Sequence, residues 1–233
     1  NNVDAFVICP APGKETKTML NRLQGERPFI LINEDTYYAE EPSGYATVKP
    51  DNYKIGQMLA KRLIQDDEEQ LENKKIGVIL GKAETEENVN RIAGLKDGLE
   101  GSGCEISWEY NYARGNQNTS EIIASKKQVD YLVILDNWAL EEVGEAAEEN
   151  KYHGAKIYGV GSSEKAIVLL DNQNIECLVV PDDYETGYKS MNEIAKKLRH
   201  SFYKMNSCET EVRIINKEDL YSKDLERFLY SYE

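Results

Sequence analysis

The chain has 233 residues, and 40% of them are hydrophobic, which is enough to build the cores of one large domain or two of ordinary size. Its 42 acidic residues outnumber 28 basic residues and leave a formal net charge of −14, which repels nucleic acid backbones and anionic lipid surfaces. We therefore expect no direct nucleic acid contact by this segment, and no stretch approaches the ~20 apolar residues of a membrane span.

Short apolar runs alternate with helical patterns along the whole chain. We predict strands, in chain order, at residues 5–9, 29–32, 46–48, 76–80, 105–109, 131–135, 156–160 and 177–180. Helices are predicted between them at residues 15–23, 53–64, 86–99, 120–127, 139–149, 164–170 and 184–199. The run GVIL at 77–80 is apolar on both faces, which is typical of a parallel strand covered by helices. The sequence therefore predicts an α/β fold with parallel sheets flanked by helices.

A seven-residue phrase occurs twice, as PDNYKIG at residues 50–56 and as PDDYETG at residues 181–187. Each copy follows an apolar run and opens a helix, and its Asp, at 51 or 182, stands where a helix needs an N-cap. Apolar residues fall on one face of each helix: Ile55, Met58, Leu59 and Leu63 in the first, and Tyr184, Tyr188, Met191, Ala195 and Leu198 in the second. The repeat predicts one chain that builds two similar lobes.

The order of these phrases resembles the type I periplasmic-binding-protein fold, which ribose-type solute-binding proteins share with the effector-binding cores of LacI-like repressors. VDAFVI at 3–8 and RPFILIN at 27–33 are similar to the family's V-D-G-I-I-I and I-P-V-V-x-I-D strands. NRIAGL at 90–95 is similar to its E-R-x-x-G-F helix, and YGVG at 158–161 stands where V-G-F-D is usual. The two copies of the repeat resemble D-N-Y-x-x-G and D-P-Y-x-x-G, where the chain crosses between lobes.

The resemblance implies two lobes that close over a small polar ligand by a hinge motion. Lobe 1 is then residues 1–48 and 182–211, and lobe 2 is residues 49–181 and 212–233. A strand at 212–215 and a short helix at 223–229 form a tail that we expect to pack on an existing lobe. The family begins lobe 1 with two further βα units, about 60 residues, so we expect a segment before residue 1 and an incomplete lobe 1 pocket.

The resemblance also implies ligand-binding residues. Arg91 matches the arginine that reaches into the cleft of sugar binders, and the alternative is a surface arginine paired with Glu87. Asn33 and Glu34 stand where ribose-type binders carry Asp and Arg, which favours a different hydroxyl pattern or a cationic ligand. Asp136 matches the acid of an N-D-x-x-A-L-G loop, although its expected role is to cap the following helix.

The rest of the predicted ligand-binding set comes from loops that follow strands, where ligands bind in such sheets: Asn137, Trp138, Ser162 and Asp182. Trp138, like Tyr112, has a ring that suits the apolar face of a sugar, and core packing is the alternative for both. The stretch GVGSS at 159–163 is also weakly similar to a phosphate cradle.

Two departures from the family concern sugar binding. Gly161 replaces the aspartate of V-G-F-D, and Val180-Pro181 replace the glutamine that commonly ends the last strand. Both missing side chains are typical partners of sugar hydroxyls. We therefore predict weak or no affinity for ribose-like sugars.

The sequence predicts no cofactor, no metal site and no catalysis. Its four cysteines, Cys9, Cys104, Cys177 and Cys208, have no C-x-x-C spacing, and no nucleophile motif accompanies the two histidines. We expect Cys9 and Cys177 to be buried, because both lie in apolar runs.

The leading hypothesis is a monomeric, extracytoplasmic, membrane-associated and lipoprotein-like solute-binding protein that serves an ABC importer or a membrane sensor. IINKEDLY at 214–221 resembles the I-T-K-E-N-L ending of such binders. The first alternative is the effector-binding core of a LacI-like regulator, cytoplasmic and dimeric. Others are an enzyme on a doubly wound sheet and a degenerate interaction module that fills its own pocket.

Overall fold

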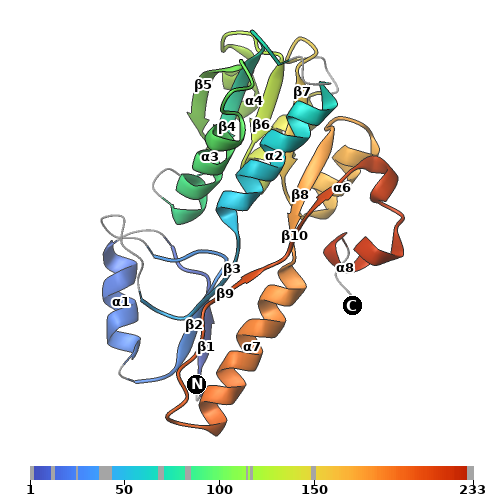
Figure 1. Ribbon diagram of the computed structural model, residues 1–233. Coiled ribbons are helices and arrows are strands. Elements are labelled where there is room, and N and C mark those ends of the chain that lie inside the picture. The colour runs from blue at the N-terminus through green and yellow to red at the C-terminus, as the bar shows by residue number, and fades with distance from the viewer. Residues whose placement is uncertain are drawn as a thin grey trace. The chain divides into compact units, whose positions relative to one another are not determined.

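The computed structural model describes residues 3–11, 14–24, 26–36, 44–67, 71–81, 85–113, 115, 118–147 and 151–229. These residues form two compact units (Figure 1). Unit 1 comprises the described residues of 1–51, 84–87 and 182–211, and unit 2 comprises those of 52–83, 88–181 and 212–233. Each unit has its own sheet and its own hydrophobic clusters.

Unit 1 has a four-stranded sheet in the order β1-β2-β3-β9, in which all neighbouring strands are parallel. Its strands are β1 (Phe6–Ile8), β2 (Phe29–Ile32), β3 (Thr47–Pro50) and β9 (Cys208–Thr210). Side chains alternate between the faces of β2, so Leu31 packs with Leu20 of α1 (Lys14–Gln24) and Ile30 packs with Ile194 of α7 (Asp183–Arg199). The sheet of unit 1 therefore lies between α1 and α7 (Figure 1).

Unit 2 has a six-stranded sheet in the order β10-β8-β7-β6-β4-β5. The strands are β4 (Lys75–Leu80), β5 (Glu105–Asn111), β6 (Tyr131–Ile134), β7 (Lys156–Val160), β8 (Cys177–Pro181) and β10 (Val212–Ile215). Neighbours are parallel except β10, which pairs antiparallel with β8. The helices are α2 (Asn52–Asp66), α3 (Glu86–Gly98, whose first two residues belong to unit 1), α4 (Thr119–Ala124), α5 (Asn137–Ala147) and α6 (Glu164–Asp171).

Two hydrophobic clusters lie on the two faces of this sheet. One contains Leu140 of α5, Leu169 of α6 and Ile134 of β6, and the other contains Leu59 of α2, Leu95 of α3 and Val133 of β6. The neighbouring β6 residues point to opposite faces because strand side chains alternate.

The predicted α/β class with parallel sheets is confirmed, and so is a tail that packs back on existing structure, since β10 pairs with β8. The predicted helix at 223–229 is instead a 3₁₀ turn, η2 (Lys223–Leu225), followed by one turn, α8 (Glu226–Leu229); another 3₁₀ turn, η1 (Lys217–Asp219), precedes them. Sequence reasoning missed β9, because its three residues form a strand only through their pairing with β3.

The predicted apolar face of α7 exists, but it does not face the sheet. Thr186, Ser190, Glu193 and Ile194 are buried instead. Two short hydroxyl side chains among them let the helix approach the sheet closely. The amphipathic pattern is therefore inverted relative to the usual arrangement, in which the apolar stripe meets the core.

The two cysteines that we expected to be buried differ in their exposure to solvent. Cys177 is buried within β8, as predicted, whereas Cys9 is exposed. Cys9 lies just beyond the last paired residue of β1, Ile8, so the apolar run that precedes it does not carry it into the core.

In the part of the chain that the structure describes, no helix combines the length and the hydropathy that crossing a membrane requires. Among the same residues, no group of three or more His, Cys, Asp and Glu side chains is placed to hold a metal ion.

Candidate functional site

Two glycines let α2 and α3 touch backbone to backbone. A Cβ atom added at Gly56 would collide with the carbonyl oxygen of Arg91, and one added at Gly94 would collide with the carbonyl oxygen of Tyr53. Only glycine fits where two helices approach so closely. This contact places the first turns of α2 beside the part of α3 that carries Arg91.

Arg91 is only 5% exposed, so the alternative of a surface arginine is wrong. Its Nε donates to Oδ1 of Asn52 at 3.0 Å, and its Nη1 donates to the carbonyl oxygen of Leu135 at 2.7 Å. Leu135 directly follows β6, so these bonds fix the guanidinium at the carboxyl end of the sheet. A guanidinium held in this way is preorganised for paired hydroxyls or a carboxylate.

The ends of β4 and β6 bring Asn88 and Asp136 together. The N–H of Gly81 donates to Oδ1 of Asn88 at 3.1 Å, and a Cβ atom at Gly81 would lie 2.7 Å from Oδ2 of Asp136. Oδ1 of Asp136 accepts from the N–H of Ala139 at 2.8 Å, which confirms the predicted cap of α5. Burial raises the pKa of the Asp136 carboxyl above its ordinary value, although the N–H of Ala139 and the charge of Arg91 act in the opposite direction.

Asn137 links the end of β6 to the loop after β7. Its Oδ1 accepts from the N–H of Ser162 at 3.2 Å, and its Nδ2 donates to Oε1 of Glu141 at 2.9 Å. A Cβ atom at Gly161 would lie 2.5 Å from the same Oδ1. The amide of Asn137 therefore occupies the space that a side chain at position 161 would need.

The two aromatic candidates differ in burial. Tyr112 is buried in a hydrophobic cluster of unit 2, so the core-packing alternative is correct for it. Trp138 lies on the first turn of α5 with 46% of its surface exposed. Of the two rings, Trp138 is the one available to stack on a ligand.

In unit 1, Asn33 and Glu34 follow β2. Asn33 has a φ of 69°, a left-handed conformation that asparagine tolerates better than most residues. Cys9 is exposed as a residue, but partial removal of its sulfur atom from water and the negative charges of Glu34 and Glu87 raise the pKa of the thiol above its ordinary value, while a hydrogen bond with Asn33 acts against them. This end of unit 1 is therefore acidic, and Cys9 is a protonated thiol at neutral pH.

Asp182 is fully buried at the start of α7. Its Oδ1 accepts from the N–H of Glu185 at 2.7 Å, which confirms the N-cap predicted from the repeat. Its own N–H donates to the carbonyl oxygen of Glu211 at 2.9 Å. These contacts define a capping role, and a ligand contact by Asp182 stays a prediction.

Sequence reasoning missed Asn52, Asn88, Lys49 and Glu86. Asn88 lies three residues before Arg91, so helical spacing alone indicates that they share a face. Asn52 lies within the first copy of the repeat, at residues 50–56, so its place in that motif could have indicated it. Nζ of Lys49 lies 2.6 Å from Oε1 of Glu86, whose side chain is 1% exposed, and no local pattern predicts a contact between residues so far apart in the chain.

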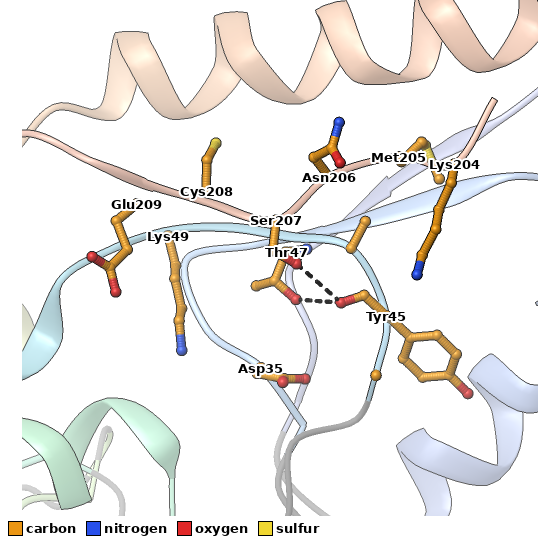
Figure 2. Close-up of a pocket in the computed structure, with 12 residues that line it drawn as sticks. Asp35, Tyr45, Thr47, Lys49, Lys204, Met205, Asn206, Ser207, Cys208 and Glu209 are labelled. Carbon is orange, nitrogen blue, oxygen red and sulfur yellow. Dashed lines mark hydrogen bonds between the residues drawn. The ribbon is translucent and has the colours of Figure 1, made fainter.

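A cavity of about 690 Å³ lies within unit 1 (Figure 2). Its wall includes β3, β9 and Asp35, and the N–H of Thr47 donates to Oγ of Ser207 at 3.1 Å beside it. Basic and acidic side chains both line the cavity, so its lining does not favour a ligand of one particular charge. None of the predicted ligand-binding residues lines this cavity.

The fold and the polar residues at the strand ends define an α/β protein built for binding, with two units and parallel sheets. The chain belongs to the periplasmic binding protein domain family, whose model matches residues 1–201. The resemblance noted in the sequence is therefore confirmed.

Named relatives agree with this family. The chain is 27% identical over 173 residues to a D-ribose/D-allose-binding protein of Pseudomonas aeruginosa, a match that covers 68% of this chain and 52% of the relative. The chain thus spans about half the length of that curated relative.

Two solved structures show the same fold. One is an ABC transporter solute-binding protein from Agrobacterium vitis bound to α-D-tagatopyranose, with a TM-score of 0.83 and 16% identity over 98% of this chain and 80% of that chain. The other is a carbohydrate transporter solute-binding protein from Agrobacterium radiobacter in complex with D-arabinose, with a TM-score of 0.81 and 18% identity over 97% of this chain and 79% of that chain.

Proposed function

We propose that this protein is an extracytoplasmic solute-binding protein that captures a small sugar-like ligand for an ABC importer. Family membership supports this proposal, as do the names of the relatives, one a ribose/allose-binding protein and another an ABC transporter solute-binding protein. The protein acts by binding and not by catalysis.

The observation that carries the proposal is the buried guanidinium of Arg91 next to Asn88 and Asp136 at the carboxyl ends of β4 and β6. Arginine donates, a carboxylate accepts, and an amide does both. Sugar hydroxyls both donate and accept, so this mixture of groups suits a polyol better than a simple ion. The exposed ring of Trp138 supplies the apolar surface that one face of a sugar ring needs.

The chemistry at position 161 supports the predicted weak affinity for ribose-like sugars. A carboxylate is absent there, and the amide of Asn137 takes its space. An amide that already accepts from the N–H of Ser162 and donates to Glu141 has less capacity left for ligand hydroxyls. We propose that the ligand differs from ribose in its hydroxyl pattern.

Isothermal titration calorimetry of the full-length protein tests the proposal, with a panel of neutral monosaccharides and polyols that includes ribose, allose, arabinose and inositol. We expect at least one of them to bind with micromolar or tighter affinity and ribose to bind weakly or not at all. If no member gives heat or changes tryptophan fluorescence, sugar binding is rejected in favour of the degenerate interaction module.

We further propose that units 1 and 2 are the predicted lobes, 1–48 with 182–211 and 49–181 with 212–233. The lipoprotein-like attachment to a membrane, and a membrane sensor in place of the importer, stay predictions. A LacI-like regulator is the runner-up. The relatives described above are named for binding or transport, which favours the solute-binding proposal over a regulator.

A further inference from the structure

The first residue of α2, Asn52, carries a buried amide whose two ends differ. Only 2% of the residue is exposed. Its Oδ1 accepts from Nε of Arg91 at 3.0 Å, whereas no group among the residues that the structure describes accepts from its Nδ2. A buried donor without an acceptor lowers stability, so the amide contributes through its acceptor oxygen. The side chain of Asn52 therefore serves Arg91.

The packing of α2 against α3 holds the two partners of this bond at a fixed distance. Gly56 lies one turn after Asn52 on the same face of α2, and a Cβ atom there would lie 2.1 Å from the carbonyl oxygen of Arg91. Gly94, in the next turn of α3 after Arg91, lies equally close to the carbonyl oxygen of Tyr53. Two contacts that only glycine permits therefore set the separation of the Asn52 and Arg91 side chains.

The guanidinium of Arg91 is held at two of its nitrogens. Nη1 donates to the carbonyl oxygen of Leu135 at 2.7 Å, and Nε donates to Asn52. One hydrogen bond alone allows a planar group to rotate about that bond, whereas a second bond at another nitrogen fixes the plane. Since Leu135 supplies only one of the two, Asn52 decides the plane in which Arg91 presents its N–H groups.

We propose that Asn52 is a positioning residue for ligand binding, which acts by fixing the plane of the Arg91 guanidinium. The inference rests on the proposed function, in which Arg91 contacts the ligand. Recognition of paired hydroxyls by an arginine depends on the orientation of its fork as well as on its charge, so a rotation of the plane lowers affinity. Asn52, Arg91 and Leu135 all belong to unit 2.

Calorimetry of the full-length protein with the ligand found in the panel compares three variants. Asn52→Leu keeps the size of the side chain but removes the acceptor, and should raise the dissociation constant by about tenfold or more. Asn52→Asp keeps an acceptor oxygen, at a helix N-terminus that favours negative charge, and should bind nearly as tightly as the wild type. Ala60→Gly is the control: it weakens α2 about two turns further along, opposite Gly98, and should leave affinity unchanged.

A double-mutant cycle tests whether Asn52 acts through Arg91. In the Arg91→Lys background, Asn52→Leu should cause no further loss of affinity, because the guanidinium that it orients is absent. A general structural role would instead give losses of affinity that add. Urea denaturation of every variant measures stability separately, so a loss of affinity that merely follows a loss of stability is recognised from Ala60→Gly.

A measurement without ligand separates this inference from the proposed function. In proton–nitrogen correlation spectra, the Nε–H of Arg91, assigned by its loss in Arg91→Lys, should exchange slowly with solvent in the wild type and in Asn52→Asp, and rapidly in Asn52→Leu. Equally slow exchange in Asn52→Leu overturns the inference, and so does an Asn52→Asp variant that binds as weakly as Asn52→Leu. If the exchange rates differ as expected but no sugar binds the wild type, the proposed function fails and the positioning of Arg91 by Asn52 stands.

Discussion

Arg91 illustrates how a charged side chain is stabilised inside this protein. It is almost fully buried, and its bonds to Asn52 and to the carbonyl oxygen of Leu135 offset part of the cost of removing a cation from water. Two glycines that follow strands, Gly81 after β4 and Gly161 after β7, act at the same scale, because each leaves room for a polar side chain. The absence of a Cβ atom at each of these glycines therefore allows polar side chains to lie at the ends of the strands in unit 2.

Arg91→Lys should weaken ligand binding at least tenfold and lower the free energy of unfolding by about 1–2 kcal/mol. The single ammonium group of a lysine cannot replace the two guanidinium nitrogens that donate to Asn52 and to the carbonyl oxygen of Leu135. Calorimetry with the ligand found in the panel and urea denaturation measure the two effects. Arg22→Lys, on the exposed surface of α1, is the control and should change neither quantity; an equal loss in that variant would contradict the prediction.

Asp136→Asn should stabilise the protein at neutral pH and flatten its acid dependence. The pKa of Asp136 is raised in the folded state, mainly by burial, so the folded protein binds more protons than the unfolded chain just above the ordinary pKa of aspartate. Stability therefore rises as pH falls through that range. Asparagine also caps helices well. Urea denaturation between about pH 4 and 7 checks this prediction, with Asp4→Asn at an exposed position as the control.

Gly161→Asp should cost about 1–3 kcal/mol of stability, because its Cβ atom would crowd Oδ1 of Asn137. The double variant with Asn137→Ala removes that crowding and places a carboxylate where ribose-type binders carry one. We expect the double variant to bind ribose at least tenfold more tightly than the wild type, as measured by calorimetry. Equal ribose binding by the single and double variants would contradict the steric argument.

At the scale of elements, the two copies of the repeat have different surroundings. Both open a helix, and Asp182 caps α7 with the hydrogen bond that its position in the phrase predicts. Gly56, however, lies against the backbone of α3, whereas a Cβ atom at Gly187 meets nothing within 4 Å. The same residue in the same phrase is therefore required by packing in one copy and not in the other.

Gly56→Ala and Gly187→Ala should have opposite effects on stability. The first pushes α2 away from α3 and disturbs the hydrogen bond between Asn52 of α2 and Arg91 of α3. We expect this change to cost about 2–3 kcal/mol or more. The second replaces a helical glycine in open space and should stabilise α7 by up to about 1 kcal/mol. Urea denaturation of the two variants checks this. Equal destabilisation by both would show that backbone contact is not what Gly56 provides.

At the scale of the whole molecule, the two units differ in how much core they possess. Among the residues that the structure describes, the hydrophobic clusters of unit 1 have three buried members each, such as Leu20, Phe29 and Leu31, with partly buried residues packed against them. The clusters of unit 2 are several times larger and cover both faces of its sheet. Since buried apolar area is the main favourable contribution to folding, unit 2 is expected to be the more stable unit.

Native-state hydrogen exchange should reflect this difference. Amides of β6 and β7 in unit 2 should exchange only through global unfolding, whereas those of β1 and β2 in unit 1 should exchange through a lower-energy opening, at least tenfold faster. Mass spectrometry of peptic peptides measures both sets in one sample. Equal protection of the two sets would show that the units unfold as a single cooperative block.

The sequence by itself determined the α/β class, the strands and most helices, and the caps at Asp136 and Asp182. These features depend on neighbours a few residues apart, so alternation, helical spacing and capping residues are sufficient to predict them. The family resemblance added Arg91 from its place in a motif.

Only the tertiary structure decided which face of α7 is buried, how Gly81 admits Asn88 and Asp136, and that Lys49 meets Glu86. Each of these depends on groups brought together from distant parts of the chain. The apolar spacing of Tyr184, Met191 and Leu198 is visible in the sequence, but its exposure is not, because the sheet beneath α7 accepts Thr186 and Ser190 in its place. Burial is a property of the packed surface, and a local pattern specifies only which residues share a face.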